Sequence, residues 1–148
     1  MFRKPGAGGY GVLFKRGNEQ KARSGGFRHT TNNRMEILAV IVALEALPKK
    51  SQVVIHSDSK YVVDAMQQGW AKRWRANGWM RNKSDKAVNP DLWERLLRLT
   101  EKHDVRFEWV RGHNHLKENE WCDQMALTAA HQADLPEDEG YRPEGNNQ

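Results

Sequence analysis

A β-branched run, Val53-Val54-Ile55, lies between two stretches with helical periodicity, and this arrangement restricts the fold more than any other feature of the sequence. Before the run, residues at helical spacing are Met35, Leu38, Ile41, Val42 and Glu45. Pro48 ends that pattern, and Ser59 to Gln68 predicts a second helix after the run. A buried strand between two helices indicates a sheet with helices packed on its faces.

The segments on either side extend this alternation. The glycine-rich stretch Pro5 to Gly11 predicts a loop, and the alternation of Tyr10, Val12 and Phe14 predicts a strand after it. A turn at residues 16–19 leads to a second strand that ends near Phe27. The first helix is expected from near Arg34 to about Leu47, with caps from residues 30–33.

The second half adds the remaining elements. We expect Ser57 or Asp58 to cap the second helix, a further helix over Pro90 to Lys102, a strand over Val105 to Val110 and a last helix over Glu118 to Ala130. The order predicts an α/β fold with a mixed β-sheet flanked by α-helices. The polar segment after His131 is expected to be a mobile extension.

Composition narrows the class of protein. The chain has 148 residues, which fits one domain, and a formal charge of +5, which favours a polyanionic partner. It has no apolar stretch of the roughly 20 residues that a membrane span needs, so we expect no membrane partner and a cytoplasmic location. The single cysteine, Cys122, is expected to be a small core residue rather than a nucleophile, because Asp123 lies beside it.

Three acidic residues have both a structural and a functional explanation. Glu36 is expected in the first turn of a helix, where the helix dipole favours a carboxylate. Asp58 follows the buried strand directly, and ligands bind at such strand ends in open α/β sheets. Asp123 is expected early in the last helix, and its ordinary interpretation is a solvated charge.

A basic, tryptophan-rich stretch, residues 69–86, is the main charge anomaly. It interleaves Trp70, Trp74 and Trp79 with six Lys and Arg residues against one acid, Asp85, a local balance of +5 that equals the excess of the whole chain. A solvated charge run is the ordinary explanation, but such runs rarely carry tryptophan. Cations next to indole rings suit contacts with phosphates and sugars.

Three long motifs occur in order: TTNNRME, HSDSKYV after the β-branched strand, and WVRGHNHLKENEWCD. Together they resemble type 1 ribonuclease H of the bacterial ribonuclease H family, from Pro5 to about Tyr141. The resemblance implies a ribonuclease H-like fold, a domain at residues 1–141 and a polar tail at 142–148. It also implies an endonuclease that hydrolyses the RNA strand of RNA/DNA hybrids.

The resemblance also assigns the catalytic group. Glu36, Asp58 and Asp123 match three of the family's metal-binding carboxylates, and the expected cofactor is a pair of Mg²⁺ or Mn²⁺ ions, which prefer such hard oxygen ligands. His113 matches the histidine that assists proton transfer or product release. His115 has no matching role, and zinc is disfavoured because no cysteine or third histidine is near.

The resemblance places the basic stretch on the protrusion that binds the DNA strand of the hybrid. The expected substrate-binding residues are Thr31, Asn32, Asn33, Lys60, Trp70, Lys72, Arg73, Trp74, Arg75 and Asn89. Trp79 and Trp93 are expected to be structural. A DNA-cutting nuclease of the same fold class, such as an integrase-like enzyme, is a more distant alternative.

The N-terminal region departs from the family pattern. Relatives of the family have a first, central strand that ends in a metal-bridging aspartate, and by this resemblance the chain starts in the loop after that strand, at Pro5-Gly6. Three explanations are open: a start at an internal methionine, a strand supplied by a partner chain in a swapped dimer, or a catalytically impaired hybrid-binding module. With the strand present, a monomer is expected.

Overall fold

The computed structural model describes residues 6–111 and 117–142. In chain order the elements are β1 (Gly6–Arg16), β2 (Glu19–Thr30), α1 (Asn32–Glu45), β3 (Gln52–Ser57), α2 (Lys60–Gln67), α3 (Trp70–Ala76), α4 (Pro90–Lys102), β4 (Asp104–Trp109) and α5 (Lys117–Ala130). The α/β class expected from the sequence is confirmed. None of the helices in the described ranges is long and apolar enough to cross a membrane.

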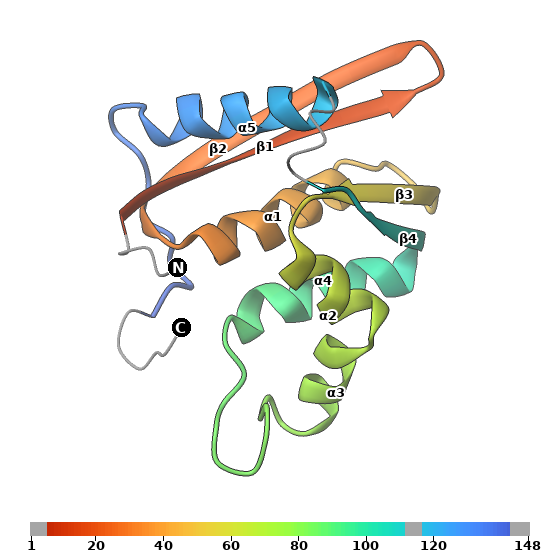
Figure 1. Cartoon of the computed structure of the whole chain (residues 1–148), viewed down its shortest axis with the longest axis vertical. Coiled ribbons are helices and arrows are strands. Elements are labelled where there is room, and N and C mark those ends of the chain that lie inside the picture. The colour runs from red at the N-terminus through yellow and green to blue at the C-terminus, as the bar shows by residue number, and fades with distance from the viewer. Residues whose placement is uncertain (1–5, 112–116, 143–148) are drawn as a thin grey trace.

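The glycine-rich segment is strand, so its prediction as a loop is wrong. β1 pairs antiparallel with β2 from Gly6 onward, and α1 and α5 cover the hairpin from opposite sides (Figure 1). A Cβ at Gly9 or Gly11 would collide with the backbone of α5, whereas one at Gly8 would meet Met35 of α1. Glycine is therefore present here because helices approach the strand closely, not because the chain turns.

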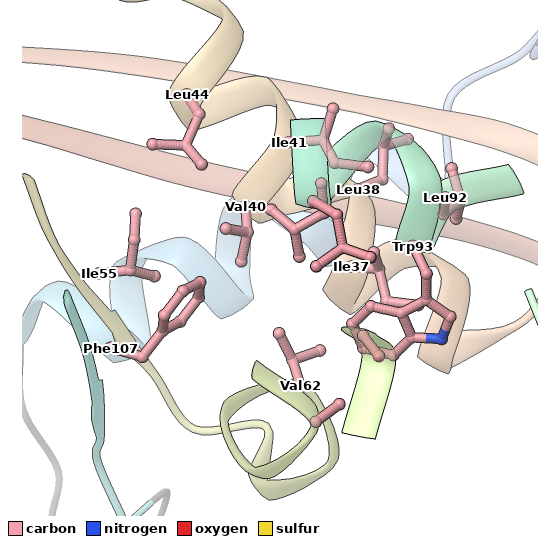
Figure 2. Packing of buried hydrophobic residues seen from close by; sticks show 14 of the residues in the cluster. Ile37, Leu38, Val40, Ile41, Leu44, Ile55, Val62, Leu92, Trp93 and Phe107 are labelled. Atoms are coloured by element: carbon pink, nitrogen blue, oxygen red, sulfur yellow. The ribbon is translucent and has the colours of Figure 1, made fainter. Parts of the chain in front are cut away.

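Helix α1 occupies the centre of the core. Its side chains Ile37, Val40, Ile41 and Leu44 are buried and point in several directions, toward the strands and toward α2 and α4 (Figure 2). Because neighbours surround the helix, it is apolar on nearly all sides instead of having one apolar stripe. Any residue on α1 that reaches solvent, such as Glu36, therefore does so at the edge of this packing.

The β structure consists of two separate ladders. β3 and β4 are parallel, with Gln52 opposite Asp104 and Ser57 opposite Trp109. Within the described residues β1 pairs only with β2 and β3 only with β4. The expected mixed sheet is thus present as an antiparallel hairpin and a parallel pair, and Ile55 of β3 and Phe107 of β4 belong to the same core cluster as the side chains of α1.

The basic stretch contains a helix that the sequence patterns did not predict. Residues 70–76 form α3, and Ala71 is its one buried residue. After α3 the chain turns through Gly78 and Trp79, both at positive φ, and Met80 bridges Lys86. This loop projects away from both ladders (Figure 1), so the cations of residues 70–86 lie on a protrusion, which we call the basic arm.

A buried arginine holds the C-terminal segment in place, so the expected mobile extension after His131 is wrong for the part that is described. Arg34 is 2% exposed and donates to both Asp138 and Asp91 at 2.7 Å. Thr30 also donates to Asp138, at 2.6 Å. Tyr141 is buried at 9% exposure, so the fold extends at least to this residue.

Candidate active site

Three elements bring together the acids that the sequence singled out. Asp58 follows the last residue of β3, Glu36 projects from α1 and Asp123 from α5. Because α1 and α5 cover opposite sides of the hairpin, Glu36 and Asp123 approach Asp58 from two directions. α1 begins at Asn32, two residues before the expected start near Arg34, so Glu36 lies beyond the first turn and its explanation by the helix dipole is weakened.

The acids share one electrostatic environment. Burial raises the pKa of Glu36 to about 7, and the charges of Asp58 and Asp123 add to this rise. Burial also raises the pKa of Asp123, with further contributions from Asp58 and Glu120. Carboxylates that repel one another across a partly desolvated site form a natural environment for a cation.

The site is open rather than a closed metal cage. In residues 6–111 and 117–142 no group of three or more His, Cys, Asp or Glu is arranged so that it could hold a metal ion. The donor chemistry nevertheless fits a hard divalent cation, since all three side chains are carboxylates and no cationic partner is among the causes of the pKa shifts at Glu36 and Asp123. The fit is thus one of charge and ligand type, and a closed ligand set requires the carboxylates to draw closer.

Asn119 is a residue of this site that the sequence reasoning missed. Its amide nitrogen donates to a carboxylate oxygen of Asp58 at 3.3 Å, across 61 residues of sequence. It lies between Glu118 and Glu120 in the first turn of α5. The contact orients Asp58 and ties the end of β3 to α5.

The structure describes Glu118 but not His113. Glu118 forms an ion pair with Lys15 of β1 at 2.8 Å, so its charge ties α5 to the hairpin. His113 lies outside the described residues, as does His115. The predicted proton-transfer role of His113 stays a prediction.

The segment before Glu36 confirms one expected role. The Thr31 hydroxyl accepts from the backbone N–H of Arg34 at 3.2 Å and so caps α1, as predicted. Asn32 and Asn33 follow in the first turn and are exposed. Their amides are therefore available to a ligand at the N-terminal end of α1, about one turn before Glu36.

The helix after Asp58 is capped by a different residue from the two expected. The Ser59 hydroxyl accepts from Val62 N–H at 3.2 Å, whereas Ser57 accepts from Ser59 N–H at 3.1 Å. Asp58 is thereby relieved of a capping role. Lys60 opens α2 and is exposed two residues after Asp58.

The basic arm has exposed cations and partly buried indoles. Lys72 and Arg73 are exposed, but Arg75 forms an ion pair with Glu101. Trp70 and Trp74 are half-buried against the core, and the Trp74 ring lies 6.0 Å from that of Trp93. The two indoles assigned to substrate contact thus also support the base of the arm.

The two tryptophans expected to be structural have such positions. Trp93 is fully buried, at 0% exposure, and Trp79 is half-buried against the same core. Asn89 is also buried, and its carboxamide oxygen accepts from Arg34 at 3.1 Å. In this structure Asn89 therefore serves the scaffold, and its predicted contact with substrate stays a prediction.

Cys122 agrees with its expected inert role. It is half-buried, and burial, followed by the charge of Asp123, raises the pKa of its thiol. A raised pKa leaves little thiolate at neutral pH, so Cys122 is a poor nucleophile.

This α/β scaffold, with acids converging from α1, β3 and α5 beside a basic arm, defines a protein of the ribonuclease H-like structural class. The chain belongs to the RNase H family, whose model matches residues 1–131. Ribonuclease H of Desulforamulus reducens is 60% identical over 134 residues, which cover 90% of this chain and 84% of that relative. Ribonuclease H of Syntrophus aciditrophicus is 58% identical, over 93% of this chain and 79% of that relative.

Solved structures agree at the level of the fold. LC9-RNase H1, a type 1 RNase H with the type 2 active-site motif, superposes with a TM-score of 0.67 at 27% identity, over 88% of this chain and 74% of that one. LC11-RNase H1, solved in complex with RNA/DNA hybrid, has a TM-score of 0.62 at 19% identity, over 88% of this chain and 90% of that one. The ribonuclease H-like fold expected from the motifs is confirmed.

Proposed function

We propose that this protein is an endonuclease that hydrolyses the RNA strand of RNA/DNA hybrids. The observation that carries the proposal is the shared acidic environment of Glu36, Asp58 and Asp123, three residues from separate elements of an RNase H family fold. The exposed cations of the basic arm supply the surface that a polyanionic duplex requires. LC11-RNase H1, which shares the fold, was solved in complex with RNA/DNA hybrid.

RNase H family enzymes use divalent metal ions. For this chain we propose two Mg²⁺ or Mn²⁺ ions per site, held by Glu36, Asp58 and Asp123. When bound, such a pair stabilises the charge that develops on the entering and leaving oxygens during in-line attack on a phosphodiester. The chain's own part is to present ionised carboxylates: Asn119 orients Asp58, and Glu36 must lose its proton before it can act as a ligand.

The substrate contacts proposed for the remaining residues follow from position and charge. Asn32 and Asn33 are suited to the RNA strand, where their amides can contact phosphate oxygens or the 2′-OH groups that distinguish RNA from DNA. Lys72 and Arg73 on α3 are suited to phosphates of the DNA strand. The domain limit at residue 141, the tail at 142–148 and the cytoplasmic location stay predictions.

The proposal is tested with a labelled hybrid duplex incubated with Mg²⁺ or Mn²⁺. We expect the RNA strand to be cut at internal positions while DNA/DNA duplex stays intact. Asp58→Asn should abolish cleavage, because a neutral amide is a poor ligand for these ions, and should leave hybrid binding nearly unchanged. Asp104→Asn is the matched control, since Asp104 begins β4 at the opposite end of the parallel pair from Asp58.

The alternatives predict different outcomes in the same assay. A hybrid-binding module without chemistry would bind the hybrid in a salt-dependent way and cut it with neither metal. A DNA-cutting nuclease of the same fold class would cut the DNA duplex. Either result would overturn the proposed activity while leaving the family assignment in place.

We further propose that an additional strand completes the β structure, from residues that precede β1 or from a second copy of the chain. Within the described part of the chain β1 and β3 are each hydrogen-bonded to one neighbour only, which leaves backbone donors and acceptors for another strand. Light scattering distinguishes the two sources, because a swapped strand requires a dimer. A monomer that gains stability and activity when a strand is fused before Gly6 would favour the first source.

A further inference from the structure

Trp109, the last residue of β4, has two cations close to its ring. The Lys60 ammonium lies 5.1 Å from the ring centroid and the Arg111 guanidinium carbon 5.8 Å from it. The indole is still 43% exposed, which makes Trp109 one of the few large apolar side chains at the described surface. We call Lys60, Trp109 and Arg111 the indole cluster.

The indole cluster borders the acidic site. Trp109 lies opposite Ser57 in the parallel register, and Val110 N–H donates to the Ser57 carbonyl at 2.9 Å, immediately before Asp58. Lys60 is two residues beyond Asp58, in the first turn of α2. Two cations and an exposed indole therefore lie at the same end of the parallel pair as the carboxylates.

The positive charges of Lys60 and Arg111 remain accessible at the surface. Lys60 pairs with Asp64 at 3.2 Å, yet the Lys60 side chain remains 65% exposed. Arg111 is exposed and contacts the Trp109 ring. Cation–π contacts explain why the three side chains associate, but they leave both charged heads at the surface, where an anion can reach them.

The acidic site itself creates the need for such cations. Glu36, Asp58 and Asp123 repel a nucleic acid backbone, and a duplex that delivers one phosphate to them must place the adjoining phosphates close by. In a duplex the base faces are stacked inside, so an indole at the rim can meet only ribose and phosphate. Cations flanking an indole are suited to that surface.

We propose that Lys60, Trp109 and Arg111 form a subsite for the ribose-phosphate backbone of the RNA strand, next to the phosphate that is cut. The inference rests on the proposed function and adds Trp109 and Arg111 to its substrate contacts. Arg111 and Lys60 bind two adjacent phosphates on one side of the scissile one, and Trp109 packs against the ribose between those two phosphates. The contact is independent of base sequence.

The experiment measures hybrid binding by fluorescence anisotropy in EDTA, where no cleavage occurs, at several KCl concentrations. Arg111→Ala should weaken binding by about three- to tenfold and reduce the slope of log K against log[salt] by about 0.9, the value for one lost phosphate contact. Trp109→Ala should weaken binding by about fivefold with the slope unchanged, because it removes apolar packing against the ribose and no charge. Arg106→Ala is the matched control: Arg106 is an exposed cation of β4, paired with Glu108, and should change neither quantity.

A second set of measurements tests which strand of the hybrid the subsite binds. Uncharged methylphosphonate linkages beside the cleavage position in the RNA strand should make Arg111→Ala cost no further affinity, whereas the same linkages in the DNA strand should leave its full effect. In cleavage assays Arg111→Ala should raise KM with kcat nearly unchanged. A circular dichroism melt shows whether Trp109→Ala folds. If it does not, the affinity and salt slope of Arg111→Ala still test the subsite.

The outcomes separate the two proposals. If the wild type binds and cuts the hybrid but Arg111→Ala has the same salt slope and affinity as Arg106→Ala, the subsite is wrong and the proposed function stands. If methylphosphonates in the DNA strand are the ones that cancel the effect, the strand assignment is wrong. A wild type that neither binds nor cuts the hybrid overturns the proposed function and the subsite with it.

Discussion

At the scale of the residue, Glu36 shows how the site departs from what stability alone would select. Its carboxyl group is largely desolvated and faces the charges of Asp58 and Asp123, so its pKa lies at about 7. The ionised form of Glu36 is therefore disfavoured in the folded, metal-free protein. Ligand binding, not packing, is what such a residue is suited to.

We predict that Glu36→Gln stabilises the metal-free protein above pH 7, by about 1 to 3 kcal/mol. The folded pKa is raised, so between the ordinary pKa of Glu and about 7 the folded state binds more protons than the unfolded state, and stability falls as pH rises through this window. The glutamine variant has no such loss. Urea unfolding at pH 4, 6 and 8 measures the difference, which should be near zero at pH 4 and largest at pH 8.

The same variant should lose cleavage, because an amide is a poor ligand for Mg²⁺ or Mn²⁺. Glu45→Gln is a suitable control: Glu45 ends the same helix and pairs with Arg95 at the surface. A Glu36→Gln variant that is no more stable than the wild type at pH 8 would contradict the raised pKa.

At the scale of the element, the packing of α5 on β1 determines where Asp123 lies. Gly9 and Gly11 face α5, and a Cβ at Gly11 would collide with the Cys122 carbonyl, one residue before Asp123. The strand can approach the helix backbone because these positions lack side chains. Helix position and carboxylate position are thus linked through two glycines.

We predict that Gly11→Ala destabilises the protein by about 1 to 3 kcal/mol, the usual cost of overpacking, and lowers kcat by displacing α5 with Asp123. Gly6→Ala is the matched control in the same strand, because a Cβ there has nothing within 4 Å. Thermal melts and cleavage rates of both variants check this. Equal melting temperatures for the two variants would show that α5 does not need the close approach.

At the scale of the whole molecule, Arg34 joins three distant parts of the chain. From α1 it donates to Asn89 and Asp91 at the start of α4 and to Asp138 in the C-terminal segment. Burial alone would raise the pKa of Asp138, but hydrogen bonds from Arg34 and Thr30 outweigh burial and lower it. The C-terminal segment is therefore held by a paired charge rather than by an apolar face.

We predict that Asp138→Asn costs about 2 to 4 kcal/mol at pH 7, because among the described residues it leaves Asp91 as the one carboxylate partner of Arg34. The folded pKa of Asp138 is lowered, so its contribution is present above the ordinary pKa of Asp and is lost as pH falls through the folded value. The gap between variant and wild type should thus narrow as pH falls below the ordinary pKa of Asp and close once Asp138 is protonated in the folded protein. Glu137→Gln, which breaks exposed contacts with Arg28 and His29, should cost less than about 1 kcal/mol.

Local patterns in the sequence were sufficient for several features. Helical spacing located α1, α4 and α5, the β-branched run located β3, and the Thr31 cap was read from its neighbours. The three motifs led to the correct family and to acids that the fold does bring into one environment. All of these depend on residues close in sequence or on long motifs matched as a whole.

Tertiary structure alone decided the rest, because the deciding contacts join residues far apart in sequence. The glycine-rich segment is strand because α5, more than 100 residues later, lies against it, and the polar C-terminal segment is ordered because Asp138 meets Arg34 across 104 residues. Asn119 donates to Asp58 across 61 residues, and Lys60 lies close to the Trp109 ring because β3 and β4 pair in parallel. The sequence by itself determined which chemical groups the protein carries, and the fold decided which of them act together.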